Sequence, residues 1–281
     1  MKKRDVEVVV VSDLHLGTYG CHAEEILKYL KSVRPQILVL NGDIVDIWQF
    51  RKHYWPKSHM KVVKYVMGLI AKGVQVYYVT GNHDEMMRKF VGFELGNFRI
   101  VNKIVLEIDG RKAWIFHGDV FDVTMQHSKW LAKLGAVGYD ILIFINTLVN
   151  FCSRLIGKGK FSFSKRIKEK VKSAVKFINN FEHTAAEIAI ANHYDYVVCG
   201  HIHQPDLREI KTDKGKTMYL NSGDWVENLT ALEYNNTQWK IYRYSDDYMT
   251  HKIQLDDADE MPDNEELFKK LLVEFDLKTN R

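Results

Sequence analysis

Strands and helices alternate along the first eighty residues of the chain, and few folds accommodate this order. Residues 8–11 are four consecutive valines, a run typical of a strand buried on both faces. Apolar runs at 36–40 and 74–80 predict two further strands, and amphipathic patterns at 24–33 and 61–72 predict the intervening helices. The alternation therefore predicts a layered α/β domain.

The second half of the chain is richer in strands. Residues 99–107 and 111–117 are predicted to be neighbouring strands joined at Asp109-Gly110, a dipeptide that favours a hairpin turn. Further strands are predicted at 196–200, 207–211, 218–221 and 230–244. Residues 122–193 contain almost no strand signal and no proline, and we interpret them as an all-helical insertion. This divides the chain into a core (1–121 and 194–250), a helical cap (122–193) and an acidic tail (251–281).

Composition restricts the class of protein further. The chain has 281 residues, of which 46% are hydrophobic and 27% charged, so disordered and collagen-like classes are excluded. Three widely spaced cysteines predict a reducing compartment without a disulfide framework. The apolar run near the start is too short for a signal sequence, and no stretch reaches the roughly 18 apolar residues of a membrane span. We expect a cytoplasmic globular protein.

Charge is distributed unevenly around the formal net value of +4. Residues 158–176 carry eight Lys or Arg residues against the single acid Glu169, whereas the chain from Asp256 onward is acidic. The basic segment favours an anionic partner, with a solvated helix face as the alternative. The acidic tail is interpreted either as a functional acidic segment or as a loosely held terminus.

Five short motifs each place metal-type ligands directly after an apolar strand. Because ligands at strand ends converge on one edge of a sheet, we expect these side chains to meet. In Asp-x-His and His-x-His, alternate side chains point the same way, so both members can reach one site. Glycines 42, 81, 118 and 200 fit tight turns beside them. The candidate ligands are Asp13, His15, Asp43, Asn82, His117, His201 and His203.

Seven oxygen and nitrogen donors are too many for one tetrahedral zinc ion and fit two adjacent divalent ions. Carboxylate, amide and imidazole ligands without cysteine favour Mn²⁺, with Zn²⁺ or Fe as alternatives. Each motif alone is weak, since a lone Asp-x-His arises by chance and a lone Gly-Asn-His-Asp can be a capped turn. Their joint occurrence, each behind a strand, predicts a metal centre.

The set of motifs resembles the calcineurin-like metallophosphoesterases. Their blocks stand here, in the family's order, as Asp13-Leu14-His15, 42–46, 81–84, 117–119 and 200–203. The resemblance implies a four-layer α/β/β/α sandwich with two ions between the loops at the strand ends. It implies that a hydroxide bridging the two ions attacks the substrate phosphorus.

Carried over to matching positions, the resemblance implies two ligand sets that share Asp43 as a bridge. Asp13, His15, Asp43 and His203 would hold one ion; Asp43, Asn82, His117 and His201 would hold the other. His83 would stand beside the reacting phosphate and stabilise or protonate its oxygens. Asp84 is expected to orient His83 or to cap the next helix, and Asp119 to support the ligands from behind.

Within that superfamily the chain is similar to the UDP-2,3-diacylglucosamine pyrophosphatases of lipid A biosynthesis. The similarity rests on SDLHLG, on GDIVDIW with Trp48, and on the insertion before GHIHQP. It implies cleavage of UDP-2,3-diacylglucosamine to UMP and 2,3-diacylglucosamine 1-phosphate. His83 departs from the arginine of that family's best-known branch, and residues 221–232 resemble a wider set of relatives. A metallophosphatase or phosphodiesterase acting on another nucleotide or lipid phosphate is therefore the alternative.

The predicted cap adds candidates for substrate binding. Residues 139–155 are apolar around most of a helix and lead into the basic segment, where Lys165 and Arg166 could rim an acyl-chain groove at an anionic membrane surface. The alternative is an ordinary helical hairpin with a solvated basic face. Trp48 could line the pocket, and Asn82, His83 and Asp122 could face substrate. No nucleic-acid partner is expected, because the basic segment adjoins an apolar helix and not a polar groove. A non-catalytic scaffold on this fold would not need the full ligand set.

Overall fold

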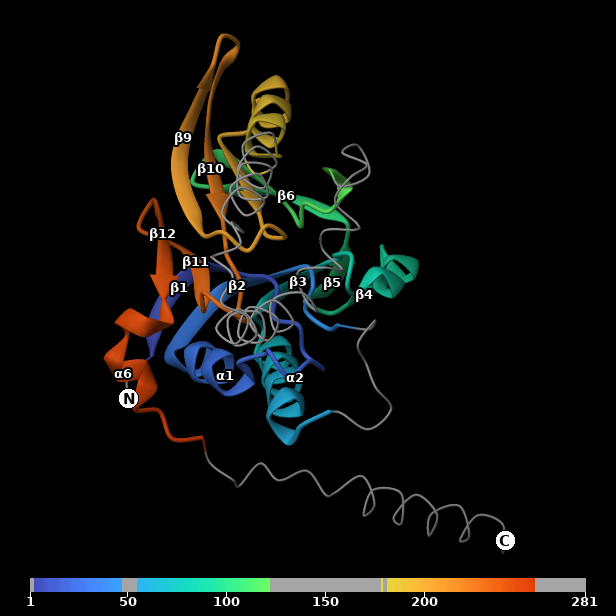
Figure 1. Cartoon of the computed structure of the whole chain (residues 1–281), viewed down its shortest axis with the longest axis vertical. Helices are drawn as coiled ribbons and strands as arrows, with labels where there is room; N and C mark the ends of the chain where they lie inside the picture. Colours follow the sequence, from blue (N-terminus) through green and yellow to red (C-terminus); the bar gives the residue numbers. More distant parts are fainter. Residues whose placement is uncertain (1–2, 47–54, 122–177, 179–180, 256–281) are drawn as a thin grey trace, which may run out of the picture.

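Two β-sheets packed face to face form the centre of the protein (Figure 1). The computed structural model of the chain describes residues 3–46, 55–121, 178 and 181–255. The first sheet, in spatial order, contains β12 (Gln238–Arg243), β11 (Thr230–Asn235), β1 (Arg4–Val11), β2 (Val33–Asn41), β3 (Gln75–Val79), β5 (Phe98–Val101) and β4 (Glu94–Leu95). The second contains β6 (Lys103–Ile108), β7 (Arg111–Phe116), β8 (Tyr196–Cys199), β10 (Gly215–Asn221) and β9 (Asp206–Thr212).

Parallel strands occupy the middle of both sheets. In the first sheet β1 pairs with β2, β2 with β3, and β3 with β5, all in parallel. In the second sheet β8 lies parallel to both β7 and β10. The carboxyl ends of neighbouring parallel strands lie at the same edge of a sheet, so the loops after them are brought together there.

The valines of β1 show why this strand lies in the middle. Val9 and Val11 pack into the core beneath α1 (Ala23–Ser32) and α2 (Lys57–Ala71), whereas Val8 and Val10 pack into the core between the sheets. At most 1% of each side chain is exposed, so a polar residue on either face of this strand would be desolvated without a partner. The prediction of a strand buried on both faces is confirmed.

A helix at 181–191 covers the outer face of the second sheet. Phe181 and three buried alanines of this helix pack against Trp114, Phe116 and Tyr219. Together with α1 and α2 on the far side, it completes the predicted order of four layers, α/β/β/α. These residues fall within the predicted cap, yet their inner face belongs to the core of the sandwich. The residues at 122–177 and 179–180 lie outside the described part of the chain, and the division into cap and core stays a prediction.

Two predicted strands are each divided in the structure. The chain predicted as one strand at 99–107 forms β5 and β6, which belong to different sheets. The break is at Asn102, whose side-chain oxygen accepts a hydrogen bond from the Thr80 hydroxyl at 2.8 Å. The run predicted at 230–244 forms the hairpin β11–β12, because Asn236 and Thr237 adopt φ values of 50° and 64° and reverse the chain. Polar residues stand at both breaks, at 102–103 and 235–238, and the predicted strands ran across them.

The last described residues return to α1. A 3-10 turn, η2 (Tyr244–Asp246), leads into the short helix α6 (Tyr248–His251), and Leu255 packs against the core beneath α1 and α2 (Figure 1). Within the described residues, no helix combines the length and the apolar character needed to cross a membrane.

Candidate metal centre

The loops after β1, β2, β3, β7 and β8 carry all seven predicted ligands. The loops after β1 and β2 continue the parallel pairing of their strands for several residues: Asp13 donates its backbone N–H to Gly42 O, and His15 donates to Asp43 O, both at 3.0 Å. Asn221, at the end of β10, binds the Gly200 carbonyl through its side-chain amide at 2.9 Å. The backbone that carries the ligands is therefore held by regular hydrogen bonds on both sheets.

An unusual backbone conformation is concentrated in these loops. Ten described residues other than glycine have positive φ, and five of them are predicted ligands: Asp13, His15, Asp43, His201 and His203. Asp and His tolerate this left-handed region better than bulky residues, but it is still unfavourable. Such conformations persist where the surroundings enforce them, and they cluster at functional sites. The strain marks this sheet edge as the functional site.

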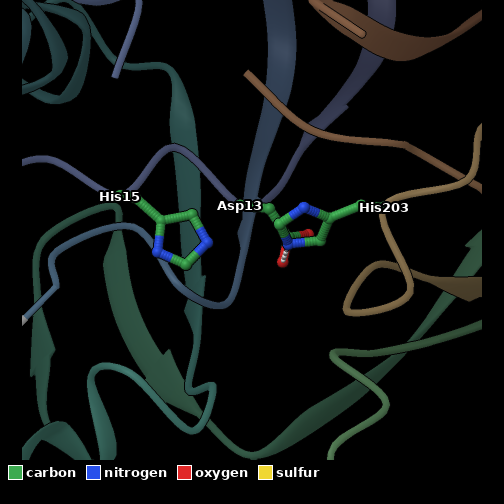
Figure 2. Close-up of side chains that lie close together, drawn as sticks. All are labelled: Asp13, His15 and His203. Atoms are coloured by element: carbon green, nitrogen blue, oxygen red, sulfur yellow. Dashed lines mark ion pairs between the residues drawn. The ribbon is translucent and has the colours of Figure 1, made fainter. Parts of the chain in front are cut away.

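Asp13, His15 and His203 form one cluster, with a ligand atom of each within 4.8 Å of the others (Figure 2). His203 Nε2 lies 3.1 Å from Asp13 Oδ1, while Asp13 Oδ2 accepts the backbone N–H of His201, also at 3.1 Å. A Cβ on Gly200 would stand 2.7 Å from Asp13 Oδ2 and 2.6 Å from the hydroxyl of Ser12. Only glycine fits at this position, so the predicted tight approach at Gly200 is confirmed.

Asp43, His117 and His201 form a second cluster of the same kind. His117 Nε2 lies 3.2 Å from Asp43 Oδ2, and the other ring nitrogen, Nδ1, lies 2.8 Å from the carbonyl oxygen of Asn41. That carbonyl can only accept, so Nδ1 carries a proton and Nε2 is the atom presented to the site. Gly42 is wedged against the same ring, since a Cβ there would stand 2.3 Å from His117 Nδ1.

The buried polar atoms of the two clusters fit divalent cations. Asp13 Oδ1, His15 Nε2 and His117 Nε2 are buried, and none makes a well-formed hydrogen bond within the described part of the chain. Asp13 Oδ1 approaches the ring of His203, and His117 Nε2 approaches the carboxylate of Asp43. Buried polar atoms without a well-formed hydrogen bond are costly. Carboxylate oxygens and imidazole nitrogens facing one another are the ligand set of first-row divalent ions. A cation between them would satisfy these atoms.

Electrostatics also favour cations at this position. Burial opposes ionisation of Asp13, but the charges of His203 and His117 outweigh it and lower its pKa to about 2. Burial also opposes ionisation of Asp43, and His117 nevertheless holds its pKa well below the usual range. In return, Asp13 overcomes the effect of burial on His203 and raises its pKa to about 9. Protons on the imidazoles thus balance buried carboxylates, and a bound cation would displace them.

His83 stands beside the first cluster and is paired with Asp46. His83 Nδ1 lies 2.8 Å from Asp46 Oδ2, and its ring meets that of His15 edge-on with 4.6 Å between centroids. Burial lowers the pKa of His83, but the hydrogen bond to Asp46 and the nearby carboxylates raise it above its usual value. Asp46 is 1% exposed and also lies 3.4 Å from His15 Nδ1. Sequence reasoning missed Asp46, although it ends the quoted block 42–46.

Asp84 does neither of the things predicted for it. Its carboxylate accepts hydrogen bonds from the backbone N–H groups of Gly81 and Ile44 and from the hydroxyl of Tyr78, at 2.6, 3.0 and 2.6 Å. It makes no side-chain cap to the following turn, η1 (Glu85–Phe90), and it is Asp46 that contacts the ring of His83. Asp84 instead joins the loop after β3 to the loop after β2.

The loop that carries Asn82 lies against Asp43. The backbone N–H of His83 donates to Asp43 Oδ1 at 2.8 Å, and a Cβ on Gly81 would stand 2.2 Å from the same oxygen. Asn82 lies between these two residues. Asp119 forms an ion pair with Arg88 of η1, which ties the loop after β7 to the loop after β3. The remaining predicted contacts lie outside the described residues: Trp48, Asp122, Lys165 and Arg166.

Residues 221–228 support the site from behind, a role that their sequence did not reveal. One oxygen of the buried Asp224 accepts the backbone N–H of Val226 at 2.8 Å and that of Asn228 at 3.2 Å. Asn228 in turn donates its side-chain amide to the carbonyl oxygen of His203 at 2.9 Å. Opposite the first cluster, His59 Nδ1 of α2 accepts the backbone N–H of Gly17 at 2.8 Å. The backbone at His203 and the backbone just after His15 are therefore each held by a side chain distant in sequence.

The chain is similar to several known proteins. A family model described as calcineurin-like phosphoesterase matches residues 6–205. A UDP-2,3-diacylglucosamine hydrolase of Blochmanniella pennsylvanica is 23% identical over 82% of this chain and 92% of its own length. One from Vibrio cholerae is 25% identical over 82% of this chain and 95% of its own. Among solved structures, the E. coli phosphoesterase YfcE has a TM-score of 0.44 and 14% identity, over 85% of this chain and 93% of that one.

Proposed function

The chain belongs to the calcineurin-like phosphoesterase family and is a metal-dependent phosphoester hydrolase, and from this premise we propose that it hydrolyses the pyrophosphate of UDP-2,3-diacylglucosamine. The products would be UMP and 2,3-diacylglucosamine 1-phosphate. The observation that carries the reaction class is the set of three Asp/His groups at one sheet edge, two made only of predicted ligands and a third formed by His15, Asp46 and His83. The substrate is supported by the names of relatives that match over four fifths of the chain. Hydrolysis of another nucleotide or lipid phosphate is the alternative.

The proposed ligand sets follow the two clusters. Asp43 would bridge the ions, as the family resemblance implies. Its Oδ2 faces His117, and its Oδ1 accepts the backbone N–H of His83. Asp13, His15 and His203 would complete one set, and Asn82, His117 and His201 the other. Two divalent cations, Mn²⁺ in this proposal with Zn²⁺ or Fe as alternatives, would supply Lewis-acid stabilisation of the phosphoryl charge.

His83 would act on the substrate directly. The carboxylate of Asp46 holds a proton on His83 Nδ1, so Nε2 at the far side of the ring is the atom left for substrate. About a third of the His83 side chain is exposed (32%), whereas the Asp46 side chain is 1% exposed. A protonated Nε2 can donate a hydrogen bond to a phosphoryl oxygen or a proton to the leaving oxygen. Asp46 would be the positioning residue for this step.

Contacts to the rest of the substrate complete the proposal. Trp48 and Asp122 would face the sugar nucleotide, and Lys165 and Arg166 would rim the groove for the acyl chains. The eight basic residues of 158–176 support a peripheral position at an anionic membrane surface on the cytoplasmic side.

Product analysis tests the substrate. Purified protein loaded with Mn²⁺ is incubated with UDP-2,3-diacylglucosamine, and the products are separated by chromatography and identified by mass. We expect UMP and the acylated sugar phosphate, at a kcat/KM of about 10⁴ M⁻¹s⁻¹ or more. Asp43→Ala should lose both activity and bound metal. Asp213→Ala, an acid exposed in the turn between β9 and β10, is the matched control and should keep both.

The possible outcomes test the proposed substrate and the proposed type of reaction separately. Metal-dependent cleavage of a generic phosphodiester without release of UMP would refute the lipid substrate and keep the hydrolase. Absence of any phosphoesterase activity in the metal-loaded protein would refute the proposed reaction as a whole.

A further inference from the structure

α1 and α2 lie on the side of the first sheet that faces away from the second (Figure 1). A groove runs between these two helices. It forms a hollow of about 320 Å³ whose apolar lining includes Leu27, Tyr65 and Leu69. A larger hollow of about 760 Å³ adjoins it at the amino-terminal end of α2. The two hollows share Leu27, Lys61 and Leu255. The groove is distinct from the metal centre, which lies at the carboxyl ends of the strands.

Lysines dominate the rim of the groove. Lys31, Lys61, Lys64 and Lys72 line the smaller hollow, and no acidic residue of the described chain lines it. The side chains of Lys31 and Lys72 form no ion pair or hydrogen bond with another described residue. Like charges crowded along one groove repel one another, and an anionic occupant would relieve this repulsion.

Gly68 leaves the floor of the groove open. It lies inside α2, where glycine is about 1 kcal/mol less favourable than alanine. A Cβ at Gly68 would meet nothing within 4 Å, so packing among the described residues gives no reason for glycine. A missing side chain at this point allows another segment to lie close against the helix.

The C-terminal segment begins at the groove and complements it. Leu255 is the last residue before the segment 256–281, and it lines both hollows. The first part, 256–266, contains Asp256, Asp257, Asp259, Glu260, Asp263, Glu265 and Glu266 and no basic residue. The second part places apolar residues at helical spacing, at Leu267, Phe268, Leu271, Leu272 and Phe275. An acidic stretch followed by an apolar one matches a groove with a lysine rim and an apolar floor.

We propose that residues 256–281 dock into the groove between α1 and α2, with the acidic part against the lysines and the apolar part over the partly exposed Tyr65 and Gly68. The reach is sufficient, because the 15 residues of α2 span about 22 Å, which roughly seven extended residues cover. Tethering at Leu255 keeps the segment at a high effective concentration, so weak contacts are enough to hold it. Docking does not depend on the reaction proposed above.

Zero-length carbodiimide cross-linking of the full chain tests the docking. The reagent joins a lysine to a carboxylate only when the two are in contact, and mass spectrometry identifies the joined peptides. We expect Lys31, Lys64 and Lys72 to be joined to residues 256–266 at least about 5-fold more often than the exposed Lys112 and Lys214 of the second sheet. The excess should fall at about 0.5 M salt, because screening shortens the reach of the charges.

A pair of variants separates docking from general proximity. Gly68→Trp fills the groove and should lower the cross-link yield about 5-fold. Met67→Trp adds similar bulk next to it on α2, at a side chain that is 54% exposed and lines neither hollow, and should leave the yield unchanged. Equal yields for the groove lysines and the control lysines, or equal effects of the two variants, would refute the docking.

Mixing unlabelled and isotopically labelled chains identifies the occupant. Docking within one chain predicts cross-links between peptides of the same label only. Cross-links that join the two labels would mean that the groove binds a second copy, and protection of the lysines only on adding anionic vesicles would mean that it binds a membrane. Either result would overturn the proposal.

Discussion

Replacing Asp46 with asparagine measures how much one buried carboxylate contributes to catalysis by His83. Asp46 accepts a hydrogen bond from His83 Nδ1 at 2.8 Å and is 1% exposed, so water does not compensate for its loss. A hydrogen bond to a charged group is worth about 1.5–3 kcal/mol, which corresponds to about a 10- to 150-fold lower kcat if the pair acts in the transition state. Asp46 belongs to neither proposed ligand set but lies 3.4 Å from Nδ1 of the proposed ligand His15, so metal content should fall far less than kcat does.

The pH profile provides a second readout. Asp46 raises the pKa of His83, so a protonated His83 persists to higher pH in the wild type than in Asp46→Asn. If the protonated ring is the active form, the alkaline limb of kcat/KM should move to lower pH in the variant. Asp109→Asn is the matched control: it removes a carboxylate that accepts a hydrogen bond from Tyr234 at 2.7 Å, far from the metal centre, and should leave the profile intact.

The double variant decides whether Asp46 acts through His83. In a His83→Ala background, Asp46→Asn should cost little further activity, because the residue that it orients is already gone. Metal content is measured by mass spectrometry in every variant. An equal loss of kcat with and without His83, or a loss of kcat from Asp46→Asn that is no larger than its loss of metal, would refute the assignment of Asp46 as a positioning residue.

Three further predictions concern the loops and the core. Gly42→Ala should lower metal content and activity, because its Cβ would stand 2.3 Å from the imidazole of His117. Gly110→Ala, also at positive φ but with nothing within 4 Å, should keep both, and elemental analysis of the two variants distinguishes these outcomes. Glu233→Ala should lower the free energy of unfolding in urea by about 1.5–3 kcal/mol, because it removes a buried carboxylate that binds Arg4 at 2.9 and 3.0 Å, while the partly exposed Arg4 is still solvated. A loss below about 0.5 kcal/mol would contradict this. Burial opposes ionisation of Asp247, but hydrogen bonds from the hydroxyl and backbone N–H of Thr250 lower its pKa. The stabilisation that Asp247 contributes to the fold is therefore complete above the ordinary aspartate pKa of 3.8 and is lost as pH falls through the lower folded value. The difference in Tm between wild type and Asp247→Asn should therefore be constant near neutral pH and shrink below pH 3.8, and a difference that grows on acidification would show the opposite sign.

Local patterns in the sequence determined a layered α/β domain and the edge at which the ligands gather, whereas the order of four layers was implied by the family resemblance. Burial on both faces requires an uninterrupted apolar strand, so the valines of β1 could be assigned from four letters. Ligands directly after such strands must lie at the carboxyl edge of the sheet, and Asp13, Asp43 and His117 do. Spacing is sufficient here because strand direction and pleat act over only a few residues.

Contacts between distant segments were decided by tertiary structure alone. The contact of Asp13 with His203 joins residues 190 positions apart. The polar pair Asn102-Lys103 marks a break in the apolar pattern but does not say that the chain passes to the other sheet there. Asp46 and Asp84 are both buried acids in loops at strand ends, yet one contacts the ring of His83 and the other binds backbone N–H groups. The two aspartates have the same chemistry, and their roles differ because the folded backbone points their carboxylates in different directions. That direction depends on pairing and packing summed over both sheets, which no short stretch of sequence contains.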